Sequence, residues 1–455
     1  MRHLHRLATF ALSLCAVSLA ADPTPPLAAA FGEALAGKPA AFPDAALGKD
    51  QVAGEKQKQW AAYKAAATAL GWDKTPVAWP EAAPPGVVKR RADAMACDAE
   101  MMPYALMAKG APGAAGWPLF FQMHGGGSTD EKLPGPHAWP PNSQDWRVQG
   151  QIVSMLFPPG RYFIPRMAND NKGRWWYRHN MTAFDAVIKR GILFHGIDPD
   201  RVYMMGISEG AYGTEALTPF WADRLAGGCA MAGGSGGGER FCCLRNTPLR
   251  NDTGENDTMY GRAKLVLEQH ACLDGLKKAD PQGYDHSVNL QKGRGHGIDY
   301  RPGPAWIAGK VRDPHPARVC WFNYALDGVR RTDFAWLALS KAPERDALIT
   351  AETDRAANSV TVSALMNPPG SKNESPVYGE KPPETGRRLP LAGTDLIVHL
   401  DDTLLDLDQP VKIMLNGSQV FNARVVRSTR VLAETLASTG DPGRVFCARV
   451  VLKLK

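Results

Sequence analysis

The hydrophobic pattern between residues 85 and 310 alternates short apolar runs with longer stretches of helical period. Runs of strand type occupy residues 117–123, 201–205, 248–253 and 284–290, and a hairpin is expected over residues 86–109. A helix is predicted after residue 210 and another over Met181–His195, behind a further strand at residues 150–157. Strands that alternate with helices predict a mostly parallel sheet with helices on its faces. We assign residues 85–345 to this α/β domain.

The pattern changes to a period of two beyond about Thr353. Residues 357–364, 395–400 and 411–415 alternate between apolar and polar side chains, and Asn416-Gly417 is a typical hairpin turn. Short strands at this spacing predict a β-sandwich-like, all-β domain over residues 353–455. Asp401, Asp402, Asp406 and Asp408 cluster between two of these strands. Their spacing fits no known calcium loop, so solvated turn carboxylates are the preferred interpretation.

The first 84 residues divide into two parts. Residues 1–21 begin with basic side chains, continue with a short apolar stretch and end in small residues. This pattern is typical of a secretory signal peptide that is cleaved near Ala20 or Ala21, so we expect a secreted or periplasmic protein. Residues 22–84 are rich in Ala and Pro, with one helix over residues 54–70. We expect this extension to pack on the catalytic domain or on a partner.

Composition is that of an ordinary globular protein with 455 residues, 44% hydrophobic and 22% charged. The net charge of +7 is spread along the chain without a run of like charge, so nucleic-acid binding is not expected. No apolar stretch is long enough to span a bilayer. Of eight cysteines, Cys15 lies in the signal peptide, and we expect Cys242 or Cys243 to pair with Cys272 or Cys229. No Cys-x-x-Cys pair or histidine cluster indicates a zinc site.

One motif in the α/β domain points to nucleophilic catalysis. Gly206-Ile207-Ser208-Glu209-Gly210 follows a predicted strand and precedes a predicted helix. A strand, a tight turn and a helix form a nucleophile elbow, in which the serine hydroxyl stands clear of the backbone. The glycines leave room for the sharp turn and for close packing of strand and helix. We therefore predict Ser208 as the nucleophile, in preference to a plain glycine-rich turn.

A glycine run upstream supports this prediction. His124-Gly125-Gly126-Gly127 follows the strand at residues 117–123. Attack on a carbonyl creates an oxyanion that needs pre-aimed N–H donors, and glycines can present their amides without obstruction. We assign the oxyanion hole to the amides of Gly125 or Gly126 and of Glu209, the residue after the nucleophile. His124 is interpreted as a structural residue of this loop.

The base and the acid should follow the serine in the order acid, then histidine. His296 lies between two glycines just past the last predicted strand, whereas His286 lies within that strand and His270 and His315 lack such a context. We predict His296 as the base. Asp257 follows the strand at residues 248–253 and is the predicted acid, with Asp252 and Glu255 as alternatives.

The segment 161–179 is rich in arginine and aromatic residues. It includes Arg174, Trp175 and Trp176, which could stack on sugar or aryl groups or bind carboxylates. The alternative is that the tryptophans belong to the core and the arginines are solvated. If the segment reaches the site, we expect Arg174, Trp175 and Trp176 to bind substrate.

Residues from about 85 to 310 resemble an α/β-hydrolase of the secreted polyhydroxybutyrate-depolymerase and feruloyl-esterase type. The resemblance is carried by the 124–127 and 206–210 motifs together with Gly254-Glu255-Asn256-Asp257 and Gly295-His296-Gly297. It implies a triad of Ser208, Asp257 and His296, no metal or organic cofactor, and a small or polymeric ester as substrate. A secreted peptidase of the prolyl-oligopeptidase kind would use the same triad, and a non-catalytic polymer-binding protein could keep the fold.

Overall fold

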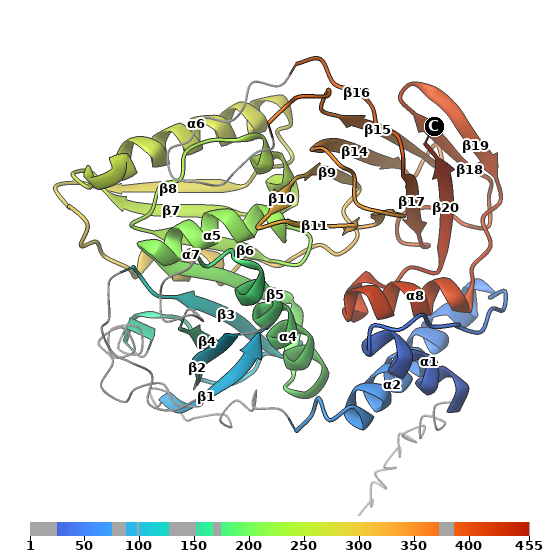
Figure 1. Cartoon of the computed structure of the whole chain (residues 1–455), viewed down its shortest axis with the longest axis horizontal. Coiled ribbons are helices and arrows are strands. Elements are labelled where there is room, and N and C mark those ends of the chain that lie inside the picture. The colour runs from blue at the N-terminus through green and yellow to red at the C-terminus, as the bar shows by residue number, and fades with distance from the viewer. Residues whose placement is uncertain are drawn as a thin grey trace, which may run out of the picture.

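The structure, a computed structural model, describes residues 25–74, 88–97, 100–126, 152–153, 155–166, 174–372 and 386–454. The predicted signal peptide lies outside these residues, as does Gly127 of the glycine run. No helix in the described ranges has the length and apolar character needed to cross a membrane. Figure 1 shows the α/β unit beside a C-terminal unit of β-strands.

The central sheet has the strand order β1-β2-β4-β3-β5-β6-β7-β8. The strands β1 and β2 form an antiparallel hairpin and β2 is antiparallel to β4, whereas β4 through β8 run parallel with β3. This order and direction are those of the α/β-hydrolase fold, as the sequence predicted. The strands span Val88–Cys97, Glu100–Lys109, Trp117–Met123 and Gly160–Pro165, followed by Ile197–Ile207, Gly227–Met231, Leu249–Gly254 and His286–Gln291.

Helices cover both faces of this sheet because its central strands are apolar on both sides. All residues of β6 are buried, and β3 is buried at every position but Pro118. The helices α4 (Arg178–Phe194), α5 (Glu209–Phe220) and α6 (Arg262–Ala279) contribute to one core, and α7 (Pro302–Ile307) contributes to the core on the other face.

One predicted strand of the α/β unit is wrong. The described residues between 150 and 157 include helical turns at 152–153 and 155–156, and the strand β4 begins only at Gly160. Ile152, Val153 and Phe157 are buried beneath the sheet, so their apolar character reflects core packing and not a strand.

The C-terminal unit contains a larger and a smaller sheet. The larger has the order β19-β18-β15-β14-β9, with β16 beside β15, and the smaller has the order β12-β13-β17-β20. Alternate residues of β15 and β17 are buried, and both strands contribute to the same core. The strands are Arg318–Asn323 (β9), Asp333–Phe334 (β12), Leu337–Leu339 (β13), Ala347–Asp354 (β14), Ser359–Met366 (β15), Leu389–Pro390 (β16), Asp395–Leu400 (β17), Val411–Leu415 (β18), Ser418–Ala423 (β19) and Ala448–Lys453 (β20), and a short pair joins Ala325–Leu326 (β10) to Val329–Arg330 (β11).

The predicted boundary of this unit, after residue 345, is too late in the chain. The strand β14 pairs with β15 on one side and with β9 on the other, so the sheet already begins at Arg318. The unit also contains a helix that the sequence analysis did not anticipate, α8 (Thr429–Thr439), which begins with a side-chain cap from Ser428.

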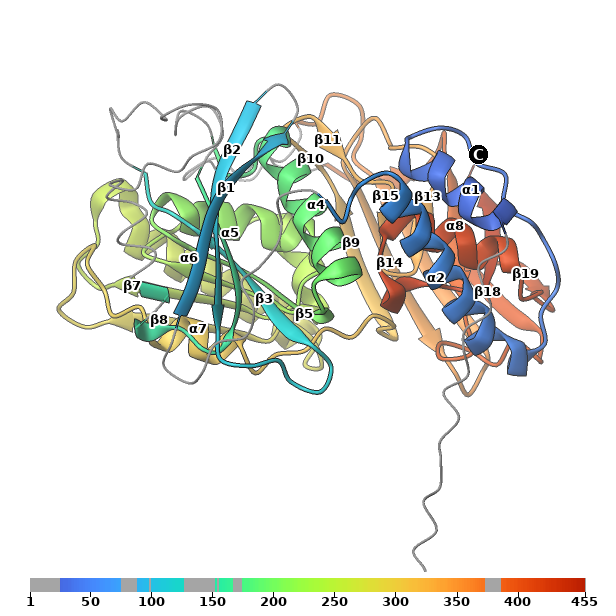
Figure 2. The same cartoon turned by 90° about the horizontal axis from the view of Figure 1, so that it is seen from below.

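The N-terminal extension packs on this helix. In two views, α8 lies between the C-terminal strands and the helices α1 (Pro25–Leu35) and α2 (Val52–Ala69) (Figure 1, Figure 2). Gln59 of α2 donates a hydrogen bond to the carbonyl of Thr429 at 2.9 Å. The extension therefore braces the C-terminal unit. It also contacts helix α4 of the catalytic domain, as predicted, since Lys64 lies over the Phe194 ring and Arg190 lies over the Trp72 ring.

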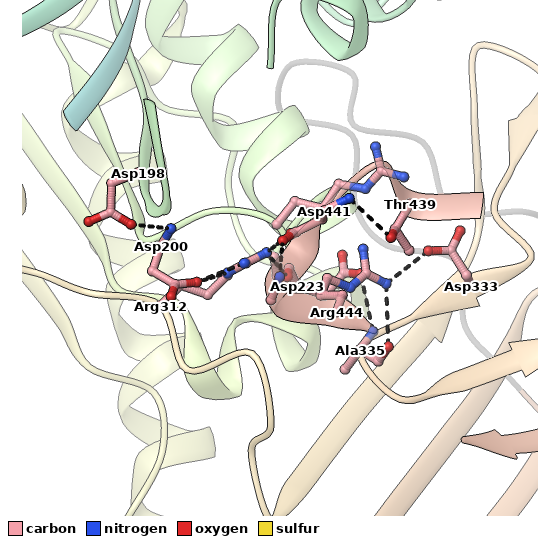
Figure 3. Close-up of polar contacts among 12 residues, drawn as sticks. Asp198, Asp200, Asp223, Arg312, Asp333, Ala335, Thr439, Asp441 and Arg444 are labelled. Carbon is pink, nitrogen blue, oxygen red and sulfur yellow. Dashed lines mark hydrogen bonds and ion pairs between the residues drawn. The ribbon is translucent and has the colours of Figure 1, made fainter. Parts of the chain in front are cut away.

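A buried network of charges joins the two units (Figure 3). The Asp223 carboxylate, which follows α5, pairs with Arg331 and with Arg444 at 2.8 Å. Arg312 pairs with Asp200 of the α/β unit at 2.7 Å and with Asp441 of the C-terminal unit at 2.5 Å. Burial opposes ionisation of Asp223, but the two arginines lower its pKa to about 2. The cluster is therefore ionised and fixes the C-terminal unit against the sheet.

The expected disulfide pairing is not present among the described cysteines. Cys242, Cys243, Cys272 and Cys229 are unpaired thiols, as are Cys320 and Cys447. Cys243 Sγ instead accepts a hydrogen bond from the Phe322 amide at 3.2 Å, in the core between the two units.

Candidate active site

Ser208 lies in a strained turn between β5 and α5. Its φ of 56° is in the left-handed region, which non-glycine residues rarely adopt. A Cβ on Gly206 would lie 2.1 Å from the Gly210 carbonyl oxygen, and one on Gly210 would lie 2.2 Å from the Met123 carbonyl oxygen. Both glycines are therefore required by close backbone approach, and the turn is a nucleophile elbow at the carboxyl end of the central strand.

The structure brings His296 and Asp257 to this serine. The Ser208 hydroxyl lies 3.1 Å from His296 Nε2, and His296 Nδ1 lies 2.7 Å from Asp257 Oδ2. Because Nδ1 faces a carboxylate, it carries the proton, which leaves Nε2 to accept the serine proton. Asp257 is buried, whereas 47% of the His296 side chain is exposed. The arrangement is that of a Ser-His-Asp triad.

The alternative acids and bases have other partners. Asp252 is buried against Arg250 at 2.8 Å, and Glu255 accepts a hydrogen bond from the Gly293 amide at 2.9 Å. His286 and His270 both contact Asp274, and His315 contacts Asp401 at 2.9 Å. The contact of Glu255 restrains the loop that carries His296, so this residue positions the base loop.

An arginine that the sequence analysis did not single out holds the acid. Arg262, at the start of α6, donates to Asp257 Oδ1 at 3.2 Å and to the Tyr212 hydroxyl at 3.1 Å. Its side chain is almost fully buried. The two oxygens of Asp257 thus have separate partners, one a guanidinium and the other the imidazole. No local motif marks Arg262, since its role depends on the fold that places α6 beside α5.

The predicted oxyanion-hole residues lie against the nucleophile. A Cβ on Gly125 would lie 3.3 Å from Ser208 Cβ, and one on Gly126 would lie 3.4 Å from Glu209 Cβ. Glu209 is the first residue of α5, where backbone N–H groups have no intrahelical acceptor and the helix dipole favours negative charge. Gly125, Gly126 and Glu209 therefore lie close to the nucleophile, where an oxyanion hole would have to be.

The two tryptophans predicted to bind substrate are core residues, so this part of the prediction is wrong. Trp175 is fully buried and its indole N–H donates to the His124 carbonyl at 3.1 Å, while Trp176 is 6% exposed. The Trp175 ring also contacts the His124 and Phe184 rings. Trp175 thus packs against His124 and helps to fix the start of the glycine loop.

Arg174, the third residue predicted to bind substrate, contacts the residue that follows the nucleophile. It pairs with Glu209 at 3.2 Å, and 43% of its side chain is exposed. Arg174, Glu209, Tyr212, Tyr260 and Arg262 line a cavity of about 230 Å³ next to the nucleophile. Tyr260 is 71% exposed and lies at its rim. Aromatic rings and guanidinium groups offer flat surfaces on which an aryl or sugar ring can stack.

The helix that follows the nucleophile, α5, carries a buried carboxyl group. Glu215 of α5 accepts a hydrogen bond from Asn251 of β7 at 2.6 Å, and Asn251 also bonds to Gln269 of α6. Burial raises the pKa of Glu215 to about 7, although hydrogen bonds from Ser235 and the charge of Arg240 oppose the shift. This polar network ties α5, α6 and β7 together beneath the site.

Comparison with known proteins gives only distant structural similarities. No known family profile matches the sequence, and no curated protein matches it. Among solved structures, a feruloyl esterase module from Clostridium thermocellum is 14% identical over 48% of this chain and 88% of its own, with a TM-score of 0.33. An acetyl xylan esterase from Paenibacillus sp. R4 is 11% identical over 55% of this chain and 93% of its own, with a TM-score of 0.35. A phospholipase/carboxylesterase from Dyadobacter fermentans is 18% identical over 45% of this chain and 94% of its own, with a TM-score of 0.30.

The strand order of the chain itself establishes the α/β-hydrolase fold, so the expected resemblance is confirmed at this level. The site brings a serine hydroxyl, an imidazole and a buried carboxylate into a hydrogen-bonded row, with two glycines beside the serine. Such a set can attack a carbonyl carbon and stabilise the tetrahedral intermediate. The triad alone does not distinguish an ester substrate from an amide substrate, because both are attacked at the carbonyl carbon and differ in the leaving group.

Proposed function

We propose that the protein is an exported serine hydrolase that cleaves carboxylic esters through Ser208, His296 and Asp257. The observation that carries this proposal is the position of His296, whose two ring nitrogens lie 3.1 Å from Ser208 Oγ and 2.7 Å from Asp257 Oδ2. Export is supported by the sequence of residues 1–21 alone.

The reaction has two halves. His296 removes the proton of Ser208 as the hydroxyl attacks the ester carbonyl, and the amides of Glu209 and of the Gly125–Gly126 loop stabilise the oxyanion. His296 then gives the proton to the departing alcohol, which leaves an acyl-enzyme. Water attacks this ester by the same route and releases the acid. Asp257, held by Arg262, stabilises the imidazolium in each half.

The substrate is proposed to be an ester with an aryl group, a sugar or a hydroxyacid. Arg174 and Tyr260 line the cavity and are exposed, so they provide the stacking surfaces for such a group. Among the described residues that line this cavity, Glu209 is the one glutamate, whereas peptidases of the prolyl-oligopeptidase type bind a free amino terminus with a pair of them.

The test is hydrolysis of a panel of p-nitrophenyl esters, short acyl and aryl, together with one dipeptide p-nitroanilide. We expect ester turnover by the mature protein, a loss on the order of a millionfold in kcat in Ser208→Ala and in His296→Ala, and unchanged rates in His315→Ala. Faster turnover of the anilide than of any ester would assign the protein to the peptidases. Ester turnover that persists in Ser208→Ala would contradict the proposed nucleophile.

A further inference from the structure

Two histidines and one aspartate lie together on the surface of the α/β unit. Within the described part of the chain, they contact one another and none of the triad residues. His270 and Asp274 lie one turn apart on α6, and His286 is the first residue of β8. One ligand atom from each lies within 4.8 Å of the other two. Residues four apart on a helix project from the same face, so His270 and Asp274 point together toward the strand.

The distances suit a tetrahedral metal ion. His286 Nε2 lies 3.2 Å from Asp274 Oδ1, and His270 Nε2 lies 3.5 Å from Asp274 Oδ2. Zinc bonds of about 2.0–2.1 Å to nitrogen and oxygen separate neighbouring ligands in a tetrahedron by roughly 3.3 Å. Two of the contacts are thus close to this spacing, and since all three ligand atoms lie within 4.8 Å of one another, rotation of the side chains can bring them around one ion.

The hydrogen bonding of His286 favours a metal ligand. Its Nδ1 lies 2.7 Å from the Tyr284 carbonyl oxygen, which can only accept, so Nδ1 carries the proton. In the neutral ring Nε2 then presents a lone pair toward the Asp274 carboxylate, which also presents lone pairs. Two acceptors that face each other at 3.2 Å need either a shared proton or a metal ion between them, and a backbone carbonyl behind the ring is one of the usual second partners of a zinc-binding histidine.

The three side chains differ in their exposure to solvent. Only 4% of the His286 side chain is exposed, whereas 61% of the Asp274 side chain is. The site is thus fixed on the strand side and open to solvent on the helix side, where an ion can enter.

We propose that His270, Asp274 and His286 bind a divalent transition metal ion, with Zn²⁺ as the expected occupant and water in the fourth position. Imidazole and carboxylate ligands in this number are those that Zn²⁺ accepts. The ion joins α6 to β8, the last strand of the central sheet. Because α6 carries Arg262 at its start and β8 leads to the His296 loop, the ion holds together the elements that carry the acid and the base.

The spacing along the chain hid this site from sequence analysis. His270 and Asp274 have the spacing of a helical pair, but His286 comes twelve residues after Asp274, beyond the end of the helix. The three residues come together only because the chain after α6 turns back and forms β8 beside β7.

The experiment is calorimetric titration of ZnCl₂ into the mature chain at neutral pH, after removal of any affinity tag. We expect one Zn²⁺ per chain in the wild type, binding at least tenfold weaker in Asp274→Asn and His270→Ala, and unchanged binding in Glu268→Gln. Glu268 is a matched control, since it is a carboxylate on the same helix that pairs with Lys264 at 3.6 Å.

Thermal unfolding gives a second readout that does not depend on activity. Zinc should raise the melting temperature of the wild type and of Glu268→Gln, because an ion that binds only the folded chain stabilises it, and should raise that of Asp274→Asn less at the same zinc concentration. Equal zinc affinity in all four proteins, or no binding by a folded wild type, would overturn the proposal. His270→Ala replaces a half-exposed helix residue by the best helix former, so a folded ligand variant is available if Asp274→Asn does not fold.

Discussion

Arg262 and Asp257 form a buried ion pair in which the guanidinium lies 3.2 Å from Oδ1 and leaves Oδ2 to His296. The arginine also bonds to the Tyr212 hydroxyl, so it connects the acid to the helix that begins at the nucleophile. The orientation of the imidazole thus depends on a residue that touches neither the serine nor the oxyanion position.

The first prediction concerns this positioning role. Arg262→Lys keeps the charge but loses the planar fork that reaches Asp257 and Tyr212 together, so the acid and the base shift. We expect kcat for p-nitrophenyl esters to fall about tenfold with little change in KM, since the lost contact acts on the transition state. The exposed Arg294, beside His296 in the chain, provides the control Arg294→Lys, with wild-type kcat expected. A wild-type kcat in Arg262→Lys would show that the ion pair does not position the triad.

The second prediction concerns the elbow. Gly210→Ala places a methyl group 2.2 Å from the Met123 carbonyl oxygen, where neither backbone can move freely. We expect the free energy of unfolding to fall by about 3 kcal/mol or more, as for severe overpacking. Gly275→Ala in α6, where no atom lies within 4 Å of the new Cβ, should instead raise stability by about 0.5–1 kcal/mol. Denaturant titration of both variants measures this difference, and similar stabilities would argue against the close packing of β3, β5 and α5.

The third prediction is a pH dependence of stability that comes from Glu215. Its pKa is about 7 in the folded protein against 4.5 for the free side chain, mainly because of burial. The folded state therefore binds a proton that the unfolded state has released between these values. The stabilising contribution is fully present below pH 4.5 and is lost as the pH rises to about 7.

Glu215→Gln removes this titration while it keeps the oxygen that accepts from Asn251. We expect the stability of the wild type relative to Glu215→Gln to decrease by a free energy on the order of 3 kcal/mol between pH 4.5 and about 7. Histidines with a lowered pKa, such as His399 at about 4, tilt the absolute stability in the opposite direction, so only the difference between the two proteins isolates Glu215. A difference that is constant across this range would contradict the raised pKa.

The fourth prediction concerns the charges between the two units. Asp223→Asn leaves Arg331 and Arg444 buried without their shared carboxylate, so we expect a loss of about 3–5 kcal/mol in the free energy of unfolding. Lys453→Ala removes the exposed pair with Asp395 and should change stability by about 1 kcal/mol at most. Chemical denaturation followed by tryptophan fluorescence compares the two. Equal effects would mean that the buried network contributes no more than a surface pair.

The features that could be predicted from the sequence are those that depend on a local pattern or on the order of motifs along the chain. The elbow could be identified because Gly206 and Gly210 are needed by backbone contacts that recur whenever such a turn forms. Asp257 and His296 followed from their order and from the strands before them. By contrast, Arg262, Glu215 and the burial of Trp175 depend on which helices pack side by side, and nothing local encodes that.

The errors in the C-terminal unit have a similar cause. The strand β9 at Arg318 is separated from β14 by short strands and turns, so its membership in the sheet appears only once the pairing is known. The helix α8 was overlooked because the surrounding period of two suggested strands throughout, although Ser428 is a typical cap at its start.

The most direct test of the central claim is covalent labelling with a fluorophosphonate, a reagent that reacts with activated serines, followed by mass spectrometry of the mature chain. The triad predicts one phosphonyl group per chain, located on Ser208, with ester hydrolysis lost in proportion to labelling, and no labelling in His296→Ala. Labelling at another serine, or none in a folded wild-type protein, would contradict the assignment of Ser208 as an activated nucleophile.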